Sequence, residues 1–262
     1  MIRPARDAAR FAAVLLLVLL ALPAVGLVAG SSPSELAGAL AMPSTQAAIA
    51  LSLRTTTVAL GVMALLGLPL AWTISRTSPR LRRWALTVVE LPVVLPPAVL
   101  GVALLETFGR RGLLGPALAS VGLSLPFTSA AVVLAQVLVG APLFVLTAVS
   151  AFRVVDDDAI LVARTLGASP TRAWFTVALP MAAPGLVSAA ALGWARALGE
   201  FGATLLFAGN LPGRTQTLPL AIYGALERDL AQARAISVLL VLLAVALLLG
   251  VRLTPLGAAR DA

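Results

Sequence analysis

The sequence predicts an all-α integral membrane protein with six transmembrane helices. Of its 262 residues, 60% are hydrophobic and 11% are charged, whereas soluble domains carry about 25% charged residues. Six apolar stretches are long enough to cross the roughly 30 Å hydrocarbon core of a bilayer, which takes about 20 residues of helix. These stretches are residues 11–29, 49–75, 84–105, 127–152, 181–208 and 235–251.

The first stretch has two interpretations. It follows three arginines and ends in a Val-Ala-Gly-Ser run, so it could be a cleaved signal peptide or a retained helix. Its apolar region is longer than the 7–15 residues or so of a signal peptide, which favours retention. We therefore expect three parts. Residues 1–48 form a tail, the first helix and an outer loop. Residues 49–251 form the transmembrane core, and residues 252–262 form a cytoplasmic tail.

The loop arginines predict the orientation in the membrane, because short cytoplasmic loops carry an excess of positive charge. With the N-terminus inside, the cytoplasmic segments hold twelve arginines and the outer segments five, which places both termini in the cytoplasm. The twelve are Arg3, Arg6, Arg10, Arg76, Arg80, Arg82, Arg83, Arg153, Arg164, Arg172, Arg252 and Arg260, and the five are Arg110, Arg111, Arg214, Arg228 and Arg234.

The composition argues against most enzyme classes. The chain has no His, no Cys and no Lys, so all 19 basic residues are Arg. A phosphate-binding loop of the Walker type needs a lysine, and zinc, haem and iron–sulfur sites depend on His and Cys. We expect no catalytic residues, no metal site and no cofactor in this chain. The net charge of +8 is explained by helix orientation in a bilayer rather than by nucleic-acid binding.

The loop at 153–180 is the longest cytoplasmic connection and reads as two short helices. Three aspartates at 156–158 would cap the first helix. Gly167 supplies a left-handed stop, Ser169 an N-cap, and Pro170 the first position of a second helix. Its surface is more apolar than a loop facing only water requires, through Ile160, Leu161, Leu166, Trp174 and Phe175. Either a partner docks there, or these residues pack under the helix ends or lie on the membrane surface.

Charges and prolines inside the predicted spans require an explanation. Arg196 and Glu200 fall in the fifth span, four residues apart and hence on one helix face. They either line a translocation path, with Arg196 compensating an oxyanion, or form a structural pair that fixes helix packing.

Arg54 is close enough to the outer end of its span to reach the interface. In the third span, Glu90 is followed by prolines that predict a bend, needed for a path or for packing alone. The path or helix-interface candidates are Pro92, Pro96, Pro97, Arg196, Glu200 and Thr204.

The 153–180 loop also carries a motif. The motif begins at Ala163, continues at Gly167 after three residues, and ends, after nine more, with Val177-Ala178-Leu179-Pro180. This spacing resembles the E-A-A-x3-G-x9-I-x-L-P motif of bacterial ABC-importer permeases. In that family this loop contains a coupling helix that docks on an ATPase subunit. One departure is that Leu161 stands at the family's glutamate and Val162 at its first alanine, so any ion pair of that glutamate is lost or replaced. The resemblance implies that ATPase coupling involves Leu161, Ala163, Arg164, Gly167, Ser169, Pro170, Leu179 and Pro180.

Further motifs are similar to the molybdate permease branch of this family. Residues 195–204 read ARALGEFGAT, 209–223 read GNLPGRTQTLPLAIY, and 91–101 read LPVVLPPAVLG. Sulfate permeases share the first run but diverge in the second. The resemblance, over about 49–251, implies a type I ABC importer permease with a cytoplasmic ATPase dimer that holds ATP and Mg, and an external molybdate-binding protein. Without an internal repeat, a two-fold path in the bacterial inner membrane would need a homodimer.

Other functions stay open at this point. Tungstate resembles molybdate in charge and size, and a sulfate or thiosulfate permease would share this architecture. An ion-coupled secondary transporter would need inverted repeats, which the sequence lacks. A non-transporting scaffold would need neither the docking loop nor proline-bent spans.

Overall fold

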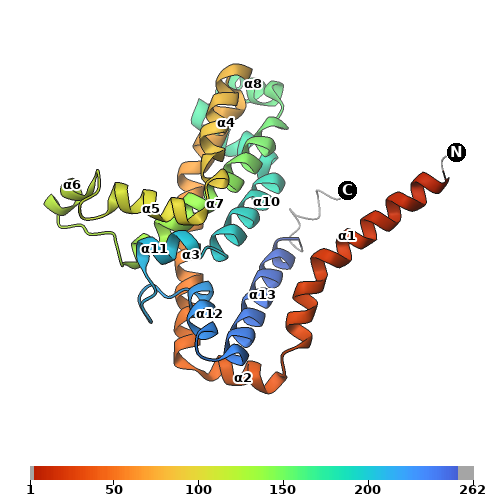
Figure 1. Ribbon diagram of the computed structural model, residues 1–262. Helices are drawn as coiled ribbons and strands as arrows, with labels where there is room; N and C mark the ends of the chain where they lie inside the picture. The colour runs from red at the N-terminus through yellow and green to blue at the C-terminus, as the bar shows by residue number, and fades with distance from the viewer. Residues whose placement is uncertain (1–2, 253–262) are drawn as a thin grey trace.

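The computed structural model describes the backbone of residues 3–252 and the side chains of residues 8–250 (Figure 1). All regular structure in this range is helical. The long helices are α1 (Arg3–Ala29), α3 (Pro43–Arg76), α7 (Ser129–Arg153), α10 (Leu179–Leu198) and α13 (Leu230–Arg252). The shorter ones are α2 (Pro33–Ala41), α4 (Pro79–Val94), α5 (Pro97–Phe108), α6 (Gly115–Ser120), α8 (Asp157–Thr165), α9 (Pro170–Ala173), a π-helical turn η1 (Trp174–Ala178), α11 (Gly202–Ala208) and α12 (Leu218–Leu226).

The predicted six-span fold is confirmed, with one boundary corrected. The stretches 11–29, 49–75, 127–152 and 235–251 fall on α1, α3, α7 and α13, which are long and apolar enough to cross a membrane. The stretch 84–105 falls on α4 and α5, which are bent by 107° at their break and count as one span if joined. The stretch 181–208 is not one helix, because α10 ends at Leu198 and α11 starts at Gly202. The predicted tail 252–262 lies, apart from the backbone of Arg252, outside the described residues.

The core is a bundle of α3, α7 and α10, whose close approach depends on small residues. Phe144 and Phe152 of α7 are buried in one hydrophobic cluster with Met63 of α3, and the Phe152 ring packs on that of Trp72. A Cβ on Gly140 would lie 2.7 Å from the Gly193 carbonyl oxygen, so α7 and α10 meet backbone to backbone there. Small residues at such crossings are the usual means of packing helices in membranes. The bundle therefore fixes the last third of α10 against the middle of α7.

Two further groups of helices surround this bundle. In one, α5 and α11 pack with the first turns of α7 around Phe207. In the other, α2 and α12 pack with α13 around Ile236. The first helix, α1, leaves the rest of the molecule (Figure 1), contacts only α13 closely, and has no buried residues along its apolar window.

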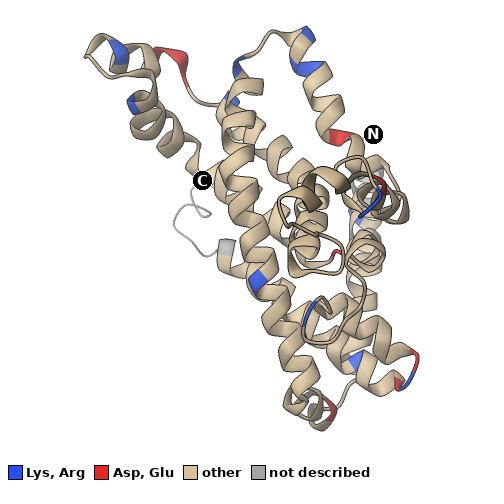
Figure 2. Cartoon of the chain, turned by 90° about the vertical axis from the view of Figure 1, so that its left-hand side faces the viewer, with Lys and Arg blue, Asp and Glu red and all other residues tan. Residues whose placement is uncertain are grey.

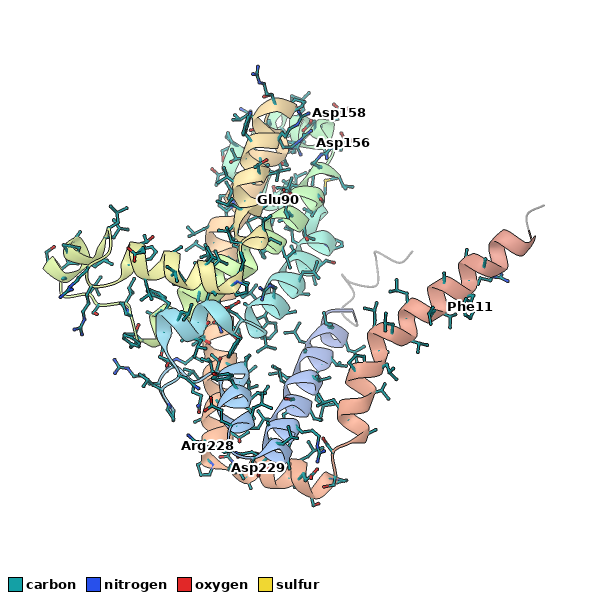
Figure 3. All side chains as sticks on the ribbon, in the orientation of Figure 1. Phe11, Glu90, Asp156, Asp158, Arg228 and Asp229 are labelled. Carbon is teal, nitrogen blue, oxygen red and sulfur yellow. The ribbon has the colours of Figure 1, made fainter. Side chains whose placement is uncertain are left out.

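Charged residues lie mainly on helix ends and connecting loops (Figure 2). Asp156 and Asp158 lie at the end of the molecule near α8, whereas Arg228 and Asp229 lie at the opposite end near α2 (Figure 3). Glu90 lies between these ends, on α4 (Figure 3).

Candidate functional sites

The loop at 153–180, which we name the elbow, begins with a capped helix. Asp156 is the N-cap of α8, and its Oδ1 accepts a hydrogen bond from the Asp158 N–H at 3.0 Å. The helix ends at Thr165, and Gly167, two residues later, has a φ of 89° in the left-handed region that favours glycine. The Ala168 N–H donates to the Ala163 carbonyl at 3.0 Å and closes this end. The predicted first helix and its stop are confirmed.

The second half of the elbow differs from the prediction. Ser169 is the N-cap, with its Oγ accepting from the Arg172 N–H at 3.2 Å, and Pro170 is in the first turn, as expected. However, α9 is not a separate short helix, since it runs through the π-helical turn into α10. Leu179 and Pro180 are therefore the first turn of α10 rather than loop residues. A displacement of the elbow can thus pass into α10 without a flexible joint between them.

Arg76 ties the elbow to the end of α3. Its Nη2 donates to the Val155 carbonyl at 3.1 Å, and its guanidinium pairs with the Asp157 carboxylate. The same guanidinium lies 4.5 Å from the centroid of the Trp72 ring, within the range of a cation–π interaction. The sequence prediction missed this site, because it counted Arg76 only as a topological charge and no local pattern links it to residues 79 positions later.

The exposed apolar surface of the elbow belongs mainly to α8 and the turn after it. The side chains of Leu161, Leu166 and Phe175 are 59%, 83% and 57% exposed, and Arg164 is exposed beside them. In contrast, Ile160 and Trp174 are half-buried and pack on the bundle core. The predicted packing under the helix ends is therefore confirmed for Ile160 and Trp174, whereas the other residues are left uncovered by this chain, and docking on them stays a prediction.

The second candidate site is where two helix breaks meet. Pro92 lies inside α4, Pro96 is the N-cap of α5, and Pro97 is in its first turn. Proline removes a backbone donor and clashes with the preceding turn, which explains the 107° bend between α4 and α5. The predicted bend in this span is confirmed.

The break between α10 and α11 lies directly against that bend. A Cβ on Gly202 would lie 2.6 Å from the Pro97 Cβ, and one on Gly101 would lie 2.7 Å from the Leu206 Cβ. These glycines let α5 and α11 approach closely. We name α5, α11 and the two breaks at 95–97 and 199–201 the junction.

Arg196 and Glu200 lie at the edge of the junction. They are not on one helix face as predicted, because α10 ends at Leu198 and Glu200 follows it. They still approach, with Arg196 Nη1 3.6 Å from Glu200 Oε2. The Glu200 side chain is 1% exposed, and its Oε1 accepts from the Ala203 N–H at 2.7 Å. Thr204 is fully buried, and its hydroxyl has no protein partner within the described residues.

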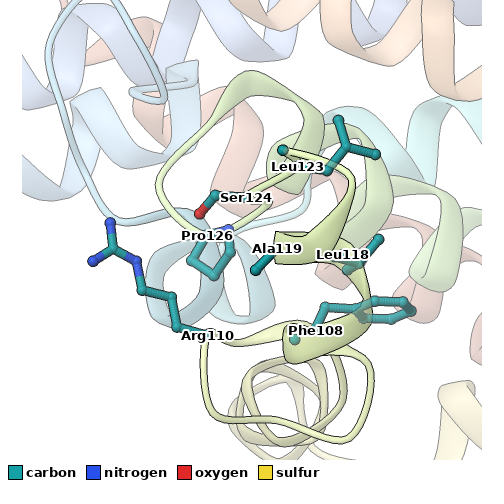
Figure 4. Close-up of a pocket in the computed structure, with 9 residues that line it drawn as sticks. Phe108, Arg110, Leu118, Ala119, Leu123, Ser124 and Pro126 are labelled. Atoms are coloured by element: carbon teal, nitrogen blue, oxygen red, sulfur yellow. The ribbon is translucent and has the colours of Figure 1, made fainter.

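One hollow near the junction belongs to the α5–α6 arm rather than to either site. It has a volume of about 390 Å³ and lies between Phe108, Leu118, Leu123 and Pro126 (Figure 4). Arg110 reaches its rim with the guanidinium turned away from the centre (Figure 4). Its lining is mainly apolar, and its one charged group lies at the edge. The hollow therefore lacks the convergent polar groups that would orient a ligand.

Comparison with known proteins identifies relatives that match most of the chain. The family described as binding-protein-dependent transport system inner membrane component matches residues 63–254. The chain is 47% identical over 216 residues to the molybdenum transport system permease protein ModB of Mycobacterium tuberculosis, with 82% of each chain covered. It is 41% identical over 189 residues to ModB of Azotobacter vinelandii, covering 71% of this chain and 84% of the relative.

Solved structures of importers share the fold. A bacterial ABC transporter involved in alginate import has a chain that superposes with a TM-score of 0.66 at 17% identity, covering 94% of both chains. The MetNI methionine ABC transporter, in an inward-facing conformation, has one with a TM-score of 0.61 at 21% identity, covering 78% of this chain and 91% of that one. At these identities the likeness concerns the fold alone.

Proposed function

The chain belongs to the family of binding-protein-dependent transport system inner membrane components, and we propose that it is the membrane-spanning permease subunit of an ATP-driven molybdate importer. The observation that carries this proposal is the elbow: a capped helix with uncovered apolar residues, continuous with a transmembrane helix. The substrate is supported by the relatives named for molybdenum transport.

The elbow supports a mechanical role. ATP and Mg are held by a separate cytoplasmic ATPase dimer, which docks on the exposed residues of α8 and the following turn. When the ATPase closes, the elbow moves with it, and the displacement passes through η1 into α10. Arg76 holds the start of α8 against α3, so the same displacement also acts on α3.

Two copies of the chain form the translocation path. Only a second copy could complete a two-fold path, since one chain shows no internal repeat. An external binding protein supplies molybdate with high affinity, so that the path itself can bind the ion weakly enough to release it.

Both termini and the elbow lie in the cytoplasm, and α2 lies outside. The chain contains no cysteine, so single introduced cysteines can report the orientation. S78C, between α3 and α4, is expected to react with an impermeant thiol reagent only from the cytoplasmic side, and S34C, on α2, only from outside. The reverse labelling would overturn this orientation.

The decisive experiment is ATP hydrolysis by the complex in lipid, with its ATPase and binding protein, titrated with molybdate, tungstate and sulfate. Stimulation by molybdate at much lower concentration than by sulfate supports the proposal, and tungstate should act like molybdate. A preference for sulfate would assign a sulfate permease instead. Failure of any ATPase to assemble with the chain would overturn the importer function.

A variant pair tests the docking surface. L161D places a charge on the 59% exposed apolar side chain of α8 and should abolish copurification of the ATPase. L230D is the matched control, because Leu230 is 69% exposed at the start of α13 near the opposite end of the molecule. Equal loss of the ATPase in both variants would contradict docking at the elbow.

A further inference from the structure

We propose that Arg196 forms a transit site for the tetrahedral dianion inside the membrane, with one guanidinium contributed by each of two copies of the chain. The inference rests on the proposed function and assigns a specific residue to the path. It follows from the depth, the exposure and the incomplete neutralisation of this side chain.

The packing of α10 on α7 fixes the depth of Arg196. Gly193 meets Gly140 backbone to backbone, and Gly140 is near the middle of α7 (Ser129–Arg153). Arg196 is three residues further along α10, or about 4.5 Å at 1.5 Å per residue. It therefore lies within the hydrocarbon depth, too far from the end of α7 to belong to the water interface.

At that depth the side chain is only partly covered by its own chain. The Arg196 side chain is 38% exposed, and it shares an uncovered strip of α10 with Leu192, one turn before, and Gly199, one turn after. A guanidinium facing lipid at this depth is strongly disfavoured, and charged residues in spans almost always face the bundle interior or a water-filled cavity. This strip therefore faces a second copy and the path between the two copies.

Glu200 holds Arg196 without fully neutralising it. Glu200 Oε1 is occupied by the Ala203 N–H at 2.7 Å, and its Oε2 is 3.6 Å from Arg196 Nη1, longer than a hydrogen bond. Within the described part of the chain this is the one ion pair of Arg196. Its planar set of N–H donors remains suited to an oxyanion, which guanidinium binds in a two-point geometry.

The same arrangement limits how tightly an anion is held. Two guanidinium groups match the two negative charges of the oxyanion, whereas the nearby Glu200 carboxylates reduce the attraction. A path must attract its ion and still release it. A buried carboxylate beside a half-exposed arginine meets both requirements.

The alternative is that the pair is only structural, and a charge-removal series separates the two roles. Molybdate uptake is measured in proteoliposomes containing the assembled complex and the binding protein, for R196Q, E200Q and R196Q/E200Q. If the pair is structural, the neutral double variant restores uptake by removing both charges. If Arg196 serves transit, uptake by R196Q and by the double variant falls about tenfold or more, the effect expected when a charge-assisted contact is lost.

Two further variants complete the series. R196K keeps the charge and should retain more uptake than R196Q. R54Q is the matched control, since Arg54 is also an exposed arginine on a spanning helix, and its uptake should match that of the unmodified chain. Copurification with the ATPase identifies any variant that does not assemble.

A second measurement tests whether restoring a positive charge at position 196 restores molybdate uptake. The only cysteine of the R196C chain would be the introduced one. A positively charged methanethiosulfonate reagent should react with it, restore part of the uptake, and be slowed by molybdate, whereas a negatively charged reagent should restore none. Lack of reaction in every nucleotide state would overturn the inference.

Failure of this inference is distinguishable from failure of the proposed function. If the unmodified complex shows no molybdate-stimulated hydrolysis or uptake, the proposed function fails. If the unmodified complex transports molybdate and R196Q/E200Q transports it equally well, only the role of Arg196 fails.

Discussion

The elbow and the junction are both breaks in long helices, but different forces hold them in shape. The elbow is fixed by caps between residues close in sequence, such as Ser169 and Arg172, and its outer surface is exposed. The junction is fixed by backbone contacts between helices about a hundred residues apart, such as Gly202 against Pro97. Consequently the elbow can move as a unit, with its own hydrogen bonds intact, whereas the junction cannot shift without losing close packing.

The largest effect is expected where this close packing is disturbed. G101A would place a Cβ 2.7 Å from the Leu206 Cβ and 3.3 Å from the Ala203 Cα. Overpacking of this kind costs about 1–3 kcal/mol, which exceeds the helix-propensity gain of about 1 kcal/mol from replacing glycine. Thermal unfolding of the purified protein in nanodiscs measures the effect.

G61A is the control for this prediction. Gly61 is also inside a spanning helix, but a Cβ there meets nothing within 4 Å, so its unfolding temperature should stay unchanged or rise. If G101A and G61A shift the unfolding temperature equally, the junction is not held by close packing.

The next prediction concerns the long-range attachment of the elbow, whose loss is expected to act on coupling rather than on the stability of the fold. R76A removes a charged donor to the Val155 carbonyl, a contact worth about 1.5–3 kcal/mol, together with the contact to Trp72. We expect lower molybdate uptake for each ATP hydrolysed, because the elbow then moves without α3. This ratio is measured in proteoliposomes.

D157A tests whether the ion pair or the carbonyl contact dominates. The Asp157 side chain is 82% exposed, and exposed ion pairs contribute about 0–1 kcal/mol. D157A should therefore reduce the ratio less than R76A does. The opposite order would mean that the ion pair is the main attachment.

The sequence predicted the caps of the elbow, but it predicted neither the attachment of the elbow to Arg76 nor the packing of the junction. Asp156, Gly167 and Ser169 act on residues within five positions, so their roles follow from local capping rules. The prolines at 92, 96 and 97 predicted the bend, yet no pattern indicated that Gly101 and Gly202 pack against α11 and Pro97. The end of α10 was missed because Gly199, Glu200 and Phe201 interrupt a stretch that stays apolar enough for one continuous span.

The exposed apolar residues of the elbow show the same limit. The sequence identified Ile160, Leu161, Leu166, Trp174 and Phe175 as a group, but burial by the distant α3 and α7 decides which of them support the elbow. The likeness to a docking motif indicated the role of the group and could not separate its members.

A smaller effect is expected from removing one cap of the elbow. S169A loses the hydrogen bond to the Arg172 N–H, which costs about 1 kcal/mol. We expect faster hydrogen exchange of the amides at 171–173, without loss of the fold. S78A is a closely matched control, because Ser78 also precedes a proline at a helix start but makes no side-chain cap hydrogen bond. Equal changes in both variants would show that the cap does not stabilise the elbow.

The smallest effect concerns α2, where a local cap and a long-range ion pair act on one carboxylate. The hydrogen bond from the Ser32 N–H lowers the pKa of Glu35 below its ordinary value of 4.5, and Arg234 on α13 lowers it further. Because the folded pKa is depressed, the contribution of Glu35 to the stability of α2 is present above pH 4.5 and is lost as the pH falls through the folded pKa. The protection of the α2 amides, measured as the exchange rate relative to the intrinsic rate at the same pH, should therefore weaken below about pH 4.5, and E35Q should remove most of this pH dependence. R234Q should remove less, because the Ser32 hydrogen bond is the larger cause. If R234Q removes as much as E35Q, the distant pair rather than the local cap governs this helix.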